Sequence, residues 1–150
     1  MKYLILLVCA VVCSLLPAAE PFRIQVKTDN PGTSTSTQFT LPLAPGETYD
    51  FTIDWGDGAV ESIARFTDTW TNPTHTYAVA GTYTISISEN TATSGFPHIY
   101  FEYGDDRLKL LQLVQWGAVH WTSFNSAFTG CENLVITATD HATAHTGTVT

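Results

Sequence analysis

FTIDWGDG, at residues 51–58, is the stretch of sequence that decides the fold. Its large apolar side chains Phe51, Ile53 and Trp55 alternate with polar ones, and a period of two residues is the pattern of a half-buried β-strand. Gly56 and Gly58 then enclose an aspartate, which predicts a tight turn because glycine adopts positive φ without steric cost. The stretch therefore predicts a strand that runs into a hairpin turn.

The same alternation recurs on both sides of this hairpin. Further alternating or strand-like runs lie at 22–27, 39–43, 60–66, 82–87 and 99–103. Pro42 lies inside the second of these runs and places it at a sheet edge or a strand end, because proline cannot donate to a β-ladder. Short strands with turn residues about every ten positions, and no helical period, are typical of a β-sandwich.

The pattern changes at about residue 105. A dense aliphatic cluster at 108–114 predicts a buried strand. Ser123 is placed to cap a short helix, and Gly130 is placed to end it. Leu134 and Ile136 then return to an extended pattern. Strand, short helix, strand is the alternation of a leucine-rich solenoid unit.

Three motifs carry a family resemblance. WGDG at 55–58 is followed by HTY at 75–77 and GTYTI at 81–85. This combination resembles the PKD domain, an immunoglobulin-like module of secreted and surface proteins. The resemblance covers about residues 21–103, and it implies that residues 20–104 form an immunoglobulin-like β-sandwich.

The later motifs resemble a second family. FPHIYF at 96–101, QWG at 115–117 and SAFTGCENL at 126–134 are similar to the start of the repeat region in BspA-type leucine-rich-repeat surface proteins of bacteria. Some members carry a PKD-like domain ahead of their repeats. The resemblance implies that residues 105–150 form the first part of a repeat region. Because members continue through many further repeats, we expect this chain to be truncated: a fragment, or a shortened member.

The N-terminus has the features of a secretory signal peptide over residues 1–19. Lys2 supplies the positive start, and residues 3–16 form an almost entirely apolar run of fourteen residues. Pro17-Ala18-Ala19 is a small-residue cleavage region. A membrane-spanning helix needs roughly 18 apolar residues. We therefore expect an exported protein, extracellular or at the cell surface, without a membrane span after cleavage.

The composition of the chain limits the classes of molecule that it can bind. The formal net charge is −8 at pH 7, which argues against nucleic acid because such binding rests on basic residues that neutralise phosphates. We expect a protein or a glycan at the cell surface as partner. Cleavage leaves Cys131 as the sole cysteine, which excludes an intramolecular disulfide, and we interpret it as a small buried apolar side chain.

Asp54 and Asp57 are the candidates for a metal site. Together with Glu61 they offer oxygen ligands near one turn, which is what calcium requires. Asp57 is also a common turn residue, Asp54 an outward strand residue, and no EF-hand-like ligand series is present. We therefore expect no metal and no cofactor, with calcium at this turn as the alternative.

Three histidines are further candidates for functional residues. His141 and His145 are four residues apart, which places two metal ligands on one face only if the segment is helical. The surrounding sequence has no apolar period, so a polar C-terminal segment is the preferred interpretation. We expect His75 to be structural and to bond a loop carbonyl, because no nucleophile motif accompanies it.

Trp70 is the candidate ligand contact, since it lies in the polar loop 67–74 and loops carry binding residues. The preferred function is a non-catalytic exported module that supports protein contact or adhesion, with the sandwich as spacer and cap for the repeats. A carbohydrate-binding accessory module is the first alternative. A hydrolase is the second, although no nucleophile, metal set or acid pair has workable spacing. The residues expected at the junction between sandwich and repeat are Leu110, Leu113, Trp116, Phe124 and Phe128.

Overall fold

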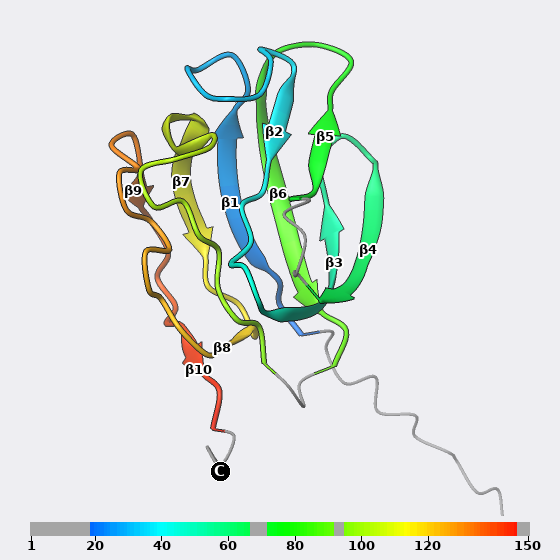
Figure 1. Cartoon of the computed structure of the whole chain (residues 1–150), viewed down its shortest axis with the longest axis vertical. Coiled ribbons are helices and arrows are strands. Elements are labelled where there is room, and N and C mark those ends of the chain that lie inside the picture. The colour runs from blue at the N-terminus through cyan, green and yellow to red at the C-terminus, as the bar shows by residue number, and fades with distance from the viewer. Residues whose placement is uncertain (1–18, 67–71, 92–94, 147–150) are drawn as a thin grey trace, which may run out of the picture.

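The computed structural model describes residues 19–66, 72–91 and 95–146. This part of the chain is mostly β, as predicted, with ten strands and one short 3₁₀ helix (Figure 1). The elements are β1 (Phe22–Lys27), β2 (Gln38–Thr40), β3 (Thr48–Asp54), β4 (Val60–Phe66), β5 (Thr74–Thr76), β6 (Thr82–Glu89), η1 (Arg107–Lys109), β7 (Leu110–Gln115), β8 (His120–Trp121), β9 (Val135–Ile136) and β10 (Thr143–Ala144).

One six-stranded sheet organises the molecule, in the order β4-β3-β6-β1-β7-β9. β3 and β4 form the predicted antiparallel hairpin around the turn at 55–59. β1 lies between β6 and β7 and pairs with both in antiparallel register. β9 joins β7 in parallel at one edge of the sheet. Two further pairs complete the fold, β2 with β5 and β8 with β10.

The alternation that predicted β1 and β3 is confirmed by their burial. Phe22, Ile24 and Val26 of β1 are fully buried, while the residues between them are partly exposed. β3 follows the same pattern through Phe51 and Ile53. Full burial of each such side chain stabilises the fold by about 1.5–3 kcal/mol. The period of two residues thus arises because every second side chain lies on the face of the sheet that contacts the core.

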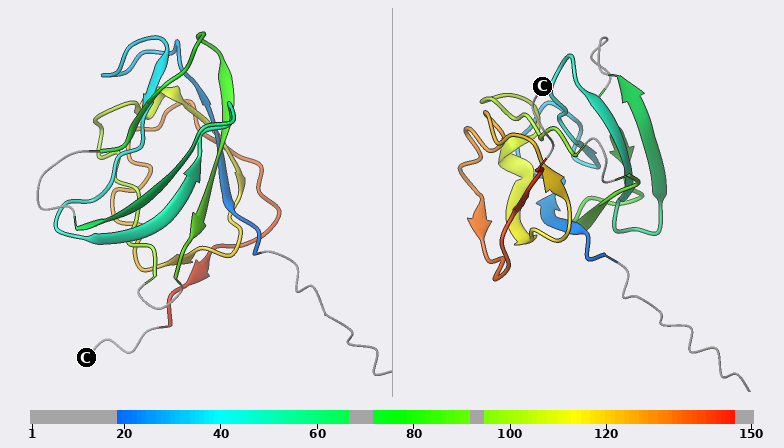
Figure 2. Two further views of the ribbon diagram at one scale, coloured as in Figure 1. Left: turned by 90° about the vertical axis from the view of Figure 1, so that its right-hand side faces the viewer. Right: turned by 90° about the horizontal axis from the view of Figure 1, so that it is seen from below.

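A second layer faces this sheet across a common core (Figure 2), an arrangement consistent with a β-sandwich. It includes β2, β5 and two irregular segments, 41–44 and 96–101, which meet at an antiparallel bridge between Leu43 and Ile99. Buried residues from both layers belong to one cluster, which also contains Leu110 and Leu113 of β7. The core of the sandwich therefore extends without interruption to β7.

The strand predicted at 99–103 does not form. Ile99 makes only the isolated bridge to Leu43, and Glu102 and Tyr103 have positive φ values of 39° and 60°. These left-handed conformations reverse the chain, and the Tyr103 N–H donates to the Thr129 carbonyl 3.1 Å away instead of to a neighbouring strand. The apolar residues Ile99 and Phe101 are buried within a loop, whereas Tyr103 is exposed.

The short helix predicted after Ser123 is also wrong. Residues 125–130 form successive turns, and the Ala127 N–H donates to the Phe124 carbonyl over 3.1 Å. Ser126 has a positive φ of 52°, which a continuous helix does not allow. The Ser123 hydroxyl does accept an N–H, from Asn125 at 3.0 Å, but it closes a local turn instead of capping a helix.

The last part of the chain returns on itself in parallel register (Figure 2, where β9 and β10 are orange and red). In every parallel pair of β7–β9 and β8–β10, the partner lies 23 residues further along the chain. The pairs are Gln112 with Val135, Leu113 with Ile136, His120 with Thr143 and Trp121 with Ala144. The constant offset shows that residues 135–144 return alongside residues 112–121 in parallel, and we refer to residues 110–144 below as the coil.

Candidate functional site

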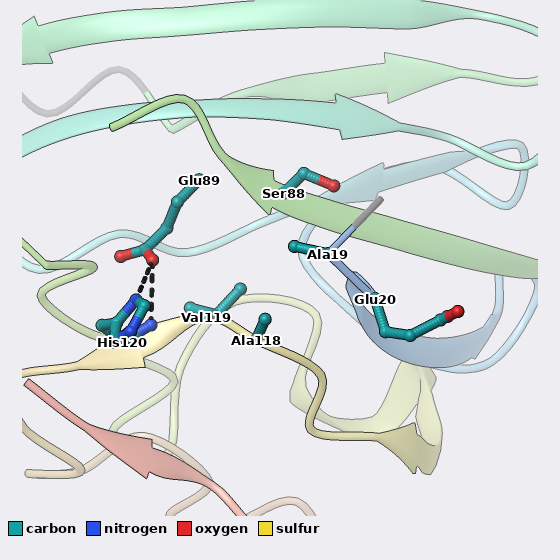
Figure 3. Close-up of a pocket in the computed structure, with 7 residues that line it drawn as sticks. All are labelled: Ala19, Glu20, Ser88, Glu89, Ala118, Val119 and His120. Carbon is teal, nitrogen blue, oxygen red and sulfur yellow. Dashed lines mark hydrogen bonds and ion pairs between the residues drawn. The ribbon is translucent and has the colours of Figure 1, made fainter. Parts of the chain in front are cut away.

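A pocket of about 140 Å³ lies where the first described residues meet the end of β6 and the start of β8 (Figure 3). It joins segments that are far apart in the sequence. Its walls are formed by Ala19, Glu20, Ser88, Glu89, Ala118, Val119 and His120. We refer to it below as the junction pocket.

The pocket exists because the main sheet forks. The β1–β6 ladder ends at the pair Phe22–Ile87, and the preceding residue, Pro21, has no N–H with which to extend it. The chain before Pro21 turns instead to the segment ahead of β8, where the Ala118 N–H donates to the Glu20 carbonyl at 2.7 Å. The last two residues of β6 therefore run on beyond β1, and the junction pocket fills the fork.

Gly117 permits this fork. It has a φ of +65°, and a Cβ at this position would collide with the backbone of Glu20 and Pro21. Glycine is therefore required here for two reasons, the left-handed conformation and the close approach of another chain segment.

Glu89 and His120 form a hydrogen-bonded pair in the wall of the pocket (Figure 3). One carboxylate oxygen, Oε2, accepts both the His120 Nδ1–H at 2.8 Å and the His120 backbone N–H at 3.0 Å. The Glu89 side chain is only 8% exposed, whereas that of His120 is 35% exposed. The carboxylate therefore fixes the orientation of an imidazole that remains accessible.

Asp140 holds the neighbouring part of the coil. Its carboxylate accepts the Trp116 N–H at 3.1 Å and the Gly117 N–H at 2.8 Å. Partial burial raises the pKa of Asp140, but these two N–H groups more than offset this, so its pKa lies below the ordinary value. An open groove of about 520 Å³ runs beside this contact, between Glu20 and Thr139. The groove and the pocket thus share the wall formed by Glu20 and Ala118.

The structure places the candidate metal ligands Asp54 and Asp57 at the predicted turn, and each bonds the turn itself. Asp54 accepts the Gly56 N–H at 2.9 Å, and Asp57 accepts the Ala59 N–H at 3.0 Å. Within the described ranges, no three histidine, cysteine, aspartate or glutamate side chains gather as a metal would require.

His75 bonds a carboxylate, not the loop carbonyl expected from the sequence. Its Nε2 lies 2.8 Å from Asp57 Oδ2, and this hydrogen bond lowers the pKa of Asp57 below its ordinary value. The ring also stacks on Trp55, with centroids 5.2 Å apart, and meets the edge of Tyr77. The Tyr77 hydroxyl donates to the Trp55 carbonyl at 3.0 Å. His75 therefore connects the turn after β3 to β5.

Trp70 falls outside the described residues. The candidates His141, His145 and Cys131 do not line the junction pocket. His141 is exposed, and the His145 backbone N–H donates to the Trp121 carbonyl in the β8–β10 pairing. Cys131 is partly buried, and this burial raises the pKa of its thiol to about 12, which disfavours the reactive thiolate.

All five residues expected at the junction contact the core. Leu110 and Leu113 are fully buried, and Trp116 and Phe128 pack against the core while partly exposed. Phe124 is 45% exposed, so it lies at the edge of the core. Its ring stacks on the buried Trp121, with centroids 5.2 Å apart.

Sequence reasoning missed the Glu89–His120 pair. The two residues are 31 positions apart and lie in segments with unrelated patterns, so no local signal joins them. No hydrogen bond connects Ser88 to His120 in the part of the chain that the structure describes. The pocket therefore offers an oriented imidazole and polar groups for binding, without a hydroxyl nucleophile positioned on that imidazole.

No protein-family model matches the chain, and comparison with curated proteins and with solved structures found no match. Among the described residues, no helix has the length and apolar character that crossing a membrane requires.

Proposed function

We propose that this protein is an exported, non-catalytic module that supports protein–protein contact at a cell surface. In this proposal the β-sandwich is a PKD-like spacer. It also covers the first coil of a BspA-type leucine-rich region, which begins near residue 105.

The constant 23-residue offset of the parallel pairs is the observation that carries the proposal. Leucine-rich repeats have a period of 20–29 residues, with one strand in each repeat, so this offset has the expected length. Such coils cannot bury their apolar faces alone and need a neighbour at each end. β1 supplies that neighbour on one side, since it pairs with β7 along four residue pairs.

The opposite side of the coil is open. Val135 and Ile136 of β9 are 60% and 59% exposed, although Ile136 pairs with the fully buried Leu113. An exposed apolar edge strand is a template for pairing with another polypeptide. The open face of the coil can therefore pair with another polypeptide, while β1 covers the other face. This supports a role in protein contact.

The turn after β3 supports the PKD-like assignment of the sandwich. Trp55, His75 and Tyr77 come from two of the three motifs that carry the resemblance, and they pack together through ring contacts and the Tyr77–Trp55 hydrogen bond. The motif residues thus form one structural unit at the turn, with Asp57 fixed by His75.

The test is a binding comparison with the exported protein. The chain is expressed with its own leader in a bacterial host, recovered from outside the cytoplasm, and its N-terminus determined by mass spectrometry. Immobilised protein is then presented with a panel of extracellular proteins and a panel of polysaccharides. We expect an N-terminus at or near Glu20 and retention of one or more proteins that survives enzymatic removal of their glycans.

A matched variant links binding to the coil. Val135→Lys adds a charge to the exposed β9 edge, whereas Val79→Lys adds the same charge at a site that is 66% exposed outside the coil. We expect Val135→Lys alone to reduce protein binding. Retention by a polysaccharide without protein binding would support the carbohydrate-binding alternative, and turnover on a glycoside or ester panel would contradict the non-catalytic role.

A further inference from the structure

The two irregular segments of the second layer, 41–44 and 96–101, meet at a short seam. The Leu43–Ile99 bridge joins them, and these two residues are 1% and 0% exposed. The contact between the segments therefore covers part of the core. We refer to it below as the layer seam.

Polar contacts to a buried tyrosine hold the layer seam together. The hydroxyl of Tyr49 on β3 donates to the His98 carbonyl at 2.6 Å and accepts the Ala44 N–H at 2.9 Å. The Tyr100 N–H donates to the Pro42 carbonyl at 3.0 Å. A change in the position of His98 therefore affects both segments and their attachment to the main sheet.

His98 is a buried histidine with an unpaired nitrogen. The residue is 7% exposed, and within the described residues its Nδ1 is buried without a hydrogen-bond partner. A neutral imidazole can leave one nitrogen bare, whereas a protonated imidazole carries a hydrogen on both nitrogens. Because a buried N–H without an acceptor is unfavourable, the closed seam favours the neutral ring.

Burial also sets the charge state of this side chain. It lowers the pKa of His98 below the ordinary value of 6.5, and the charge of Glu47 and the backbone of Pro97 offset this only in part. In an open seam the imidazole would meet water and regain its ordinary pKa. The open form therefore binds a proton more readily than the closed form.

The imidazole is the basic group of the layer seam. Glu47, which precedes β3, is the charged group that acts on it. Tyr49 and Tyr100 are its titratable neighbours, and the pKa of each lies above the ordinary value of 10, that of Tyr49 at about 12 because it is buried. Residues 41–44 and 121–123, which also pack on this segment, contain no titratable side chain. Within the described residues, proton uptake at the seam between pH 7 and pH 5 is therefore assigned to the imidazole.

We propose that His98 makes the layer seam sensitive to acid. The seam is closed at neutral pH, and it opens when the imidazole gains a proton, while the main sheet remains paired. Stability that depends on the neutral ring is fully present above about pH 6.5 and is lost as the pH falls below that value toward the lowered pKa. Opening uncovers Leu43 and Ile99, so the acidified protein presents an apolar surface that is covered at neutral pH. This behaviour does not depend on the proposed role in protein contact.

The test is native-state hydrogen exchange of the exported protein at pH 7 and pH 5, with each rate compared with that of an unstructured peptide at the same pH. The amides of Ala44 and Tyr100 report on the seam, and that of Thr28, which donates to the Gly81 carbonyl at 2.9 Å, reports on the main sheet. We expect the protection of Ala44 and Tyr100 to fall by about 10- to 25-fold at pH 5, the range that an imidazole with an ordinary pKa in the open form allows. We expect the protection of Thr28 to change by less than about twofold. Unchanged protection of the seam amides, or an equal loss at Thr28, would overturn the proposal.

His98→Phe is the matched variant, since phenylalanine keeps a ring in the seam but cannot take up a proton. Its protection at Ala44 and Tyr100 should therefore stay the same at the two pH values. His141→Phe is the control, because His141 is exposed and outside the seam, and it should keep the loss seen in the parent protein. A folded His98→Phe protein that also keeps the loss would contradict the assignment to His98.

A direct titration decides the question even if His98→Phe does not fold. The ¹H–¹³C signal of His98 Cε1 is followed in the parent protein as the pH is lowered. We expect a midpoint below 6.5, since the closed seam favours the neutral ring. A midpoint at or above 6.5 would overturn the proposal, because the seam would then lose no stability when the imidazole is protonated.

Discussion

Lys109 is a fully buried lysine at the start of an aliphatic run, and a single loop satisfies its charge. Its ammonium has three N–H groups and lies within hydrogen-bond distance of four acceptors, the carbonyls of Ser34, Thr35 and Gln38 at 2.8–3.1 Å and the Ser34 hydroxyl at 2.6 Å. Asp106, also fully buried, lies 3.6 Å away and accepts from the same loop. The pair thereby fastens the loop before β2 to the start of β7.

Replacing Lys109 with methionine should cost about 3–5 kcal/mol of unfolding free energy, because Asp106 and three carbonyls lose their buried partner. Urea unfolding measures this directly. Lys27→Met is the control, since Lys27 and its partner Asp29 are 41% and 42% exposed and such surface pairs contribute about 0–1 kcal/mol. Similar costs for the two variants would contradict the fastening role of Lys109.

The Asp57–His75 bond predicts a pH dependence. The pKa of Asp57 is lower in the folded protein than its ordinary value, which is about 4 in an unfolded chain. The charged carboxylate therefore stabilises the fold above that pH, and the contribution is lost as the pH falls through the lowered pKa. We expect the urea midpoint of the parent protein to fall more steeply on acidification below about pH 4 than that of Asp57→Asn.

His75→Phe provides the companion variant for this measurement. Phenylalanine keeps an aromatic ring against Trp55 but cannot bond Asp57. Its midpoint should therefore show the same shallow acid dependence as that of Asp57→Asn. If both variants keep the slope of the parent protein, the bond does not set the pKa of Asp57.

At the level of elements, the fork beside β1 depends on Gly117. Gly117→Ala adds a Cβ where the backbone of Glu20 and Pro21 lies, and it places alanine at a φ of +65°. The left-handed conformation alone costs about 1–2 kcal/mol, and displacing the adjacent backbone adds about 1–3 kcal/mol. We expect a total loss of about 3 kcal/mol in urea unfolding.

Gly46→Ala separates these two contributions. Gly46 has a similar φ of +72°, but a Cβ there would meet no atom within 4 Å. It should lose only the conformational part, about 1–2 kcal/mol. Equal losses at Gly46 and Gly117 would show that Glu20 and Pro21 do not lie against Gly117.

The sequence predicts the elements whose pattern follows from burial on one face. The strands expected for β1, β3, β4 and β6 lie within two residues of their observed bounds, because alternation directly reflects the side of the sheet that meets the core. The run at 99–103 shows the limit of this reasoning. Ile99 and Phe101 are buried, as the alternation predicts, but the positive φ values of Glu102 and Tyr103 turn the backbone away from any ladder, and Tyr103 is 69% exposed.

The sequence does not reveal which strands pair or which polar groups meet. Nothing in the residues of β7 indicates that it joins β1, since an aliphatic run is compatible with many neighbours. The same is true of Lys109, whose burial requires acceptors from a loop more than 70 positions earlier. The junction pocket depends on such long-range pairing, which explains why no local pattern predicts its residues.

At the scale of the whole molecule, the shared core predicts a single unfolding event. The cluster that contains Phe22 and Trp55 also contains Leu113 and Trp121 of the coil. Hydrophobic contacts that cross between two segments make them unfold together. Two variants keep only Trp55 or only Trp121, with the other tryptophans replaced by phenylalanine. In each variant we expect the urea midpoint of tryptophan fluorescence to equal the urea midpoint of circular dichroism.

Two midpoints, with the Trp121 signal changing first, would indicate that the coil unfolds separately from the sandwich. That result would contradict the proposal that the sandwich stabilises the coil through the pairing of β1 with β7. The tryptophan replacements can themselves change stability. For each variant, the fluorescence midpoint is therefore compared with the circular dichroism midpoint of that same variant, not with that of the parent protein.

The central claim, that residues 110–144 form a regular coil continuing the core of the sandwich, is tested most directly by native-state hydrogen exchange of three amides. The N–H groups of Thr137 and Ala138 donate to the Leu113 carbonyl at 3.0 and 3.1 Å, and that of His145 donates to the Trp121 carbonyl at 2.8 Å. If the coil is formed as described, all three should exchange at least roughly 100-fold more slowly than in an unstructured peptide. Exchange of these amides at the unprotected rate, while β1 remains protected, would contradict the claim.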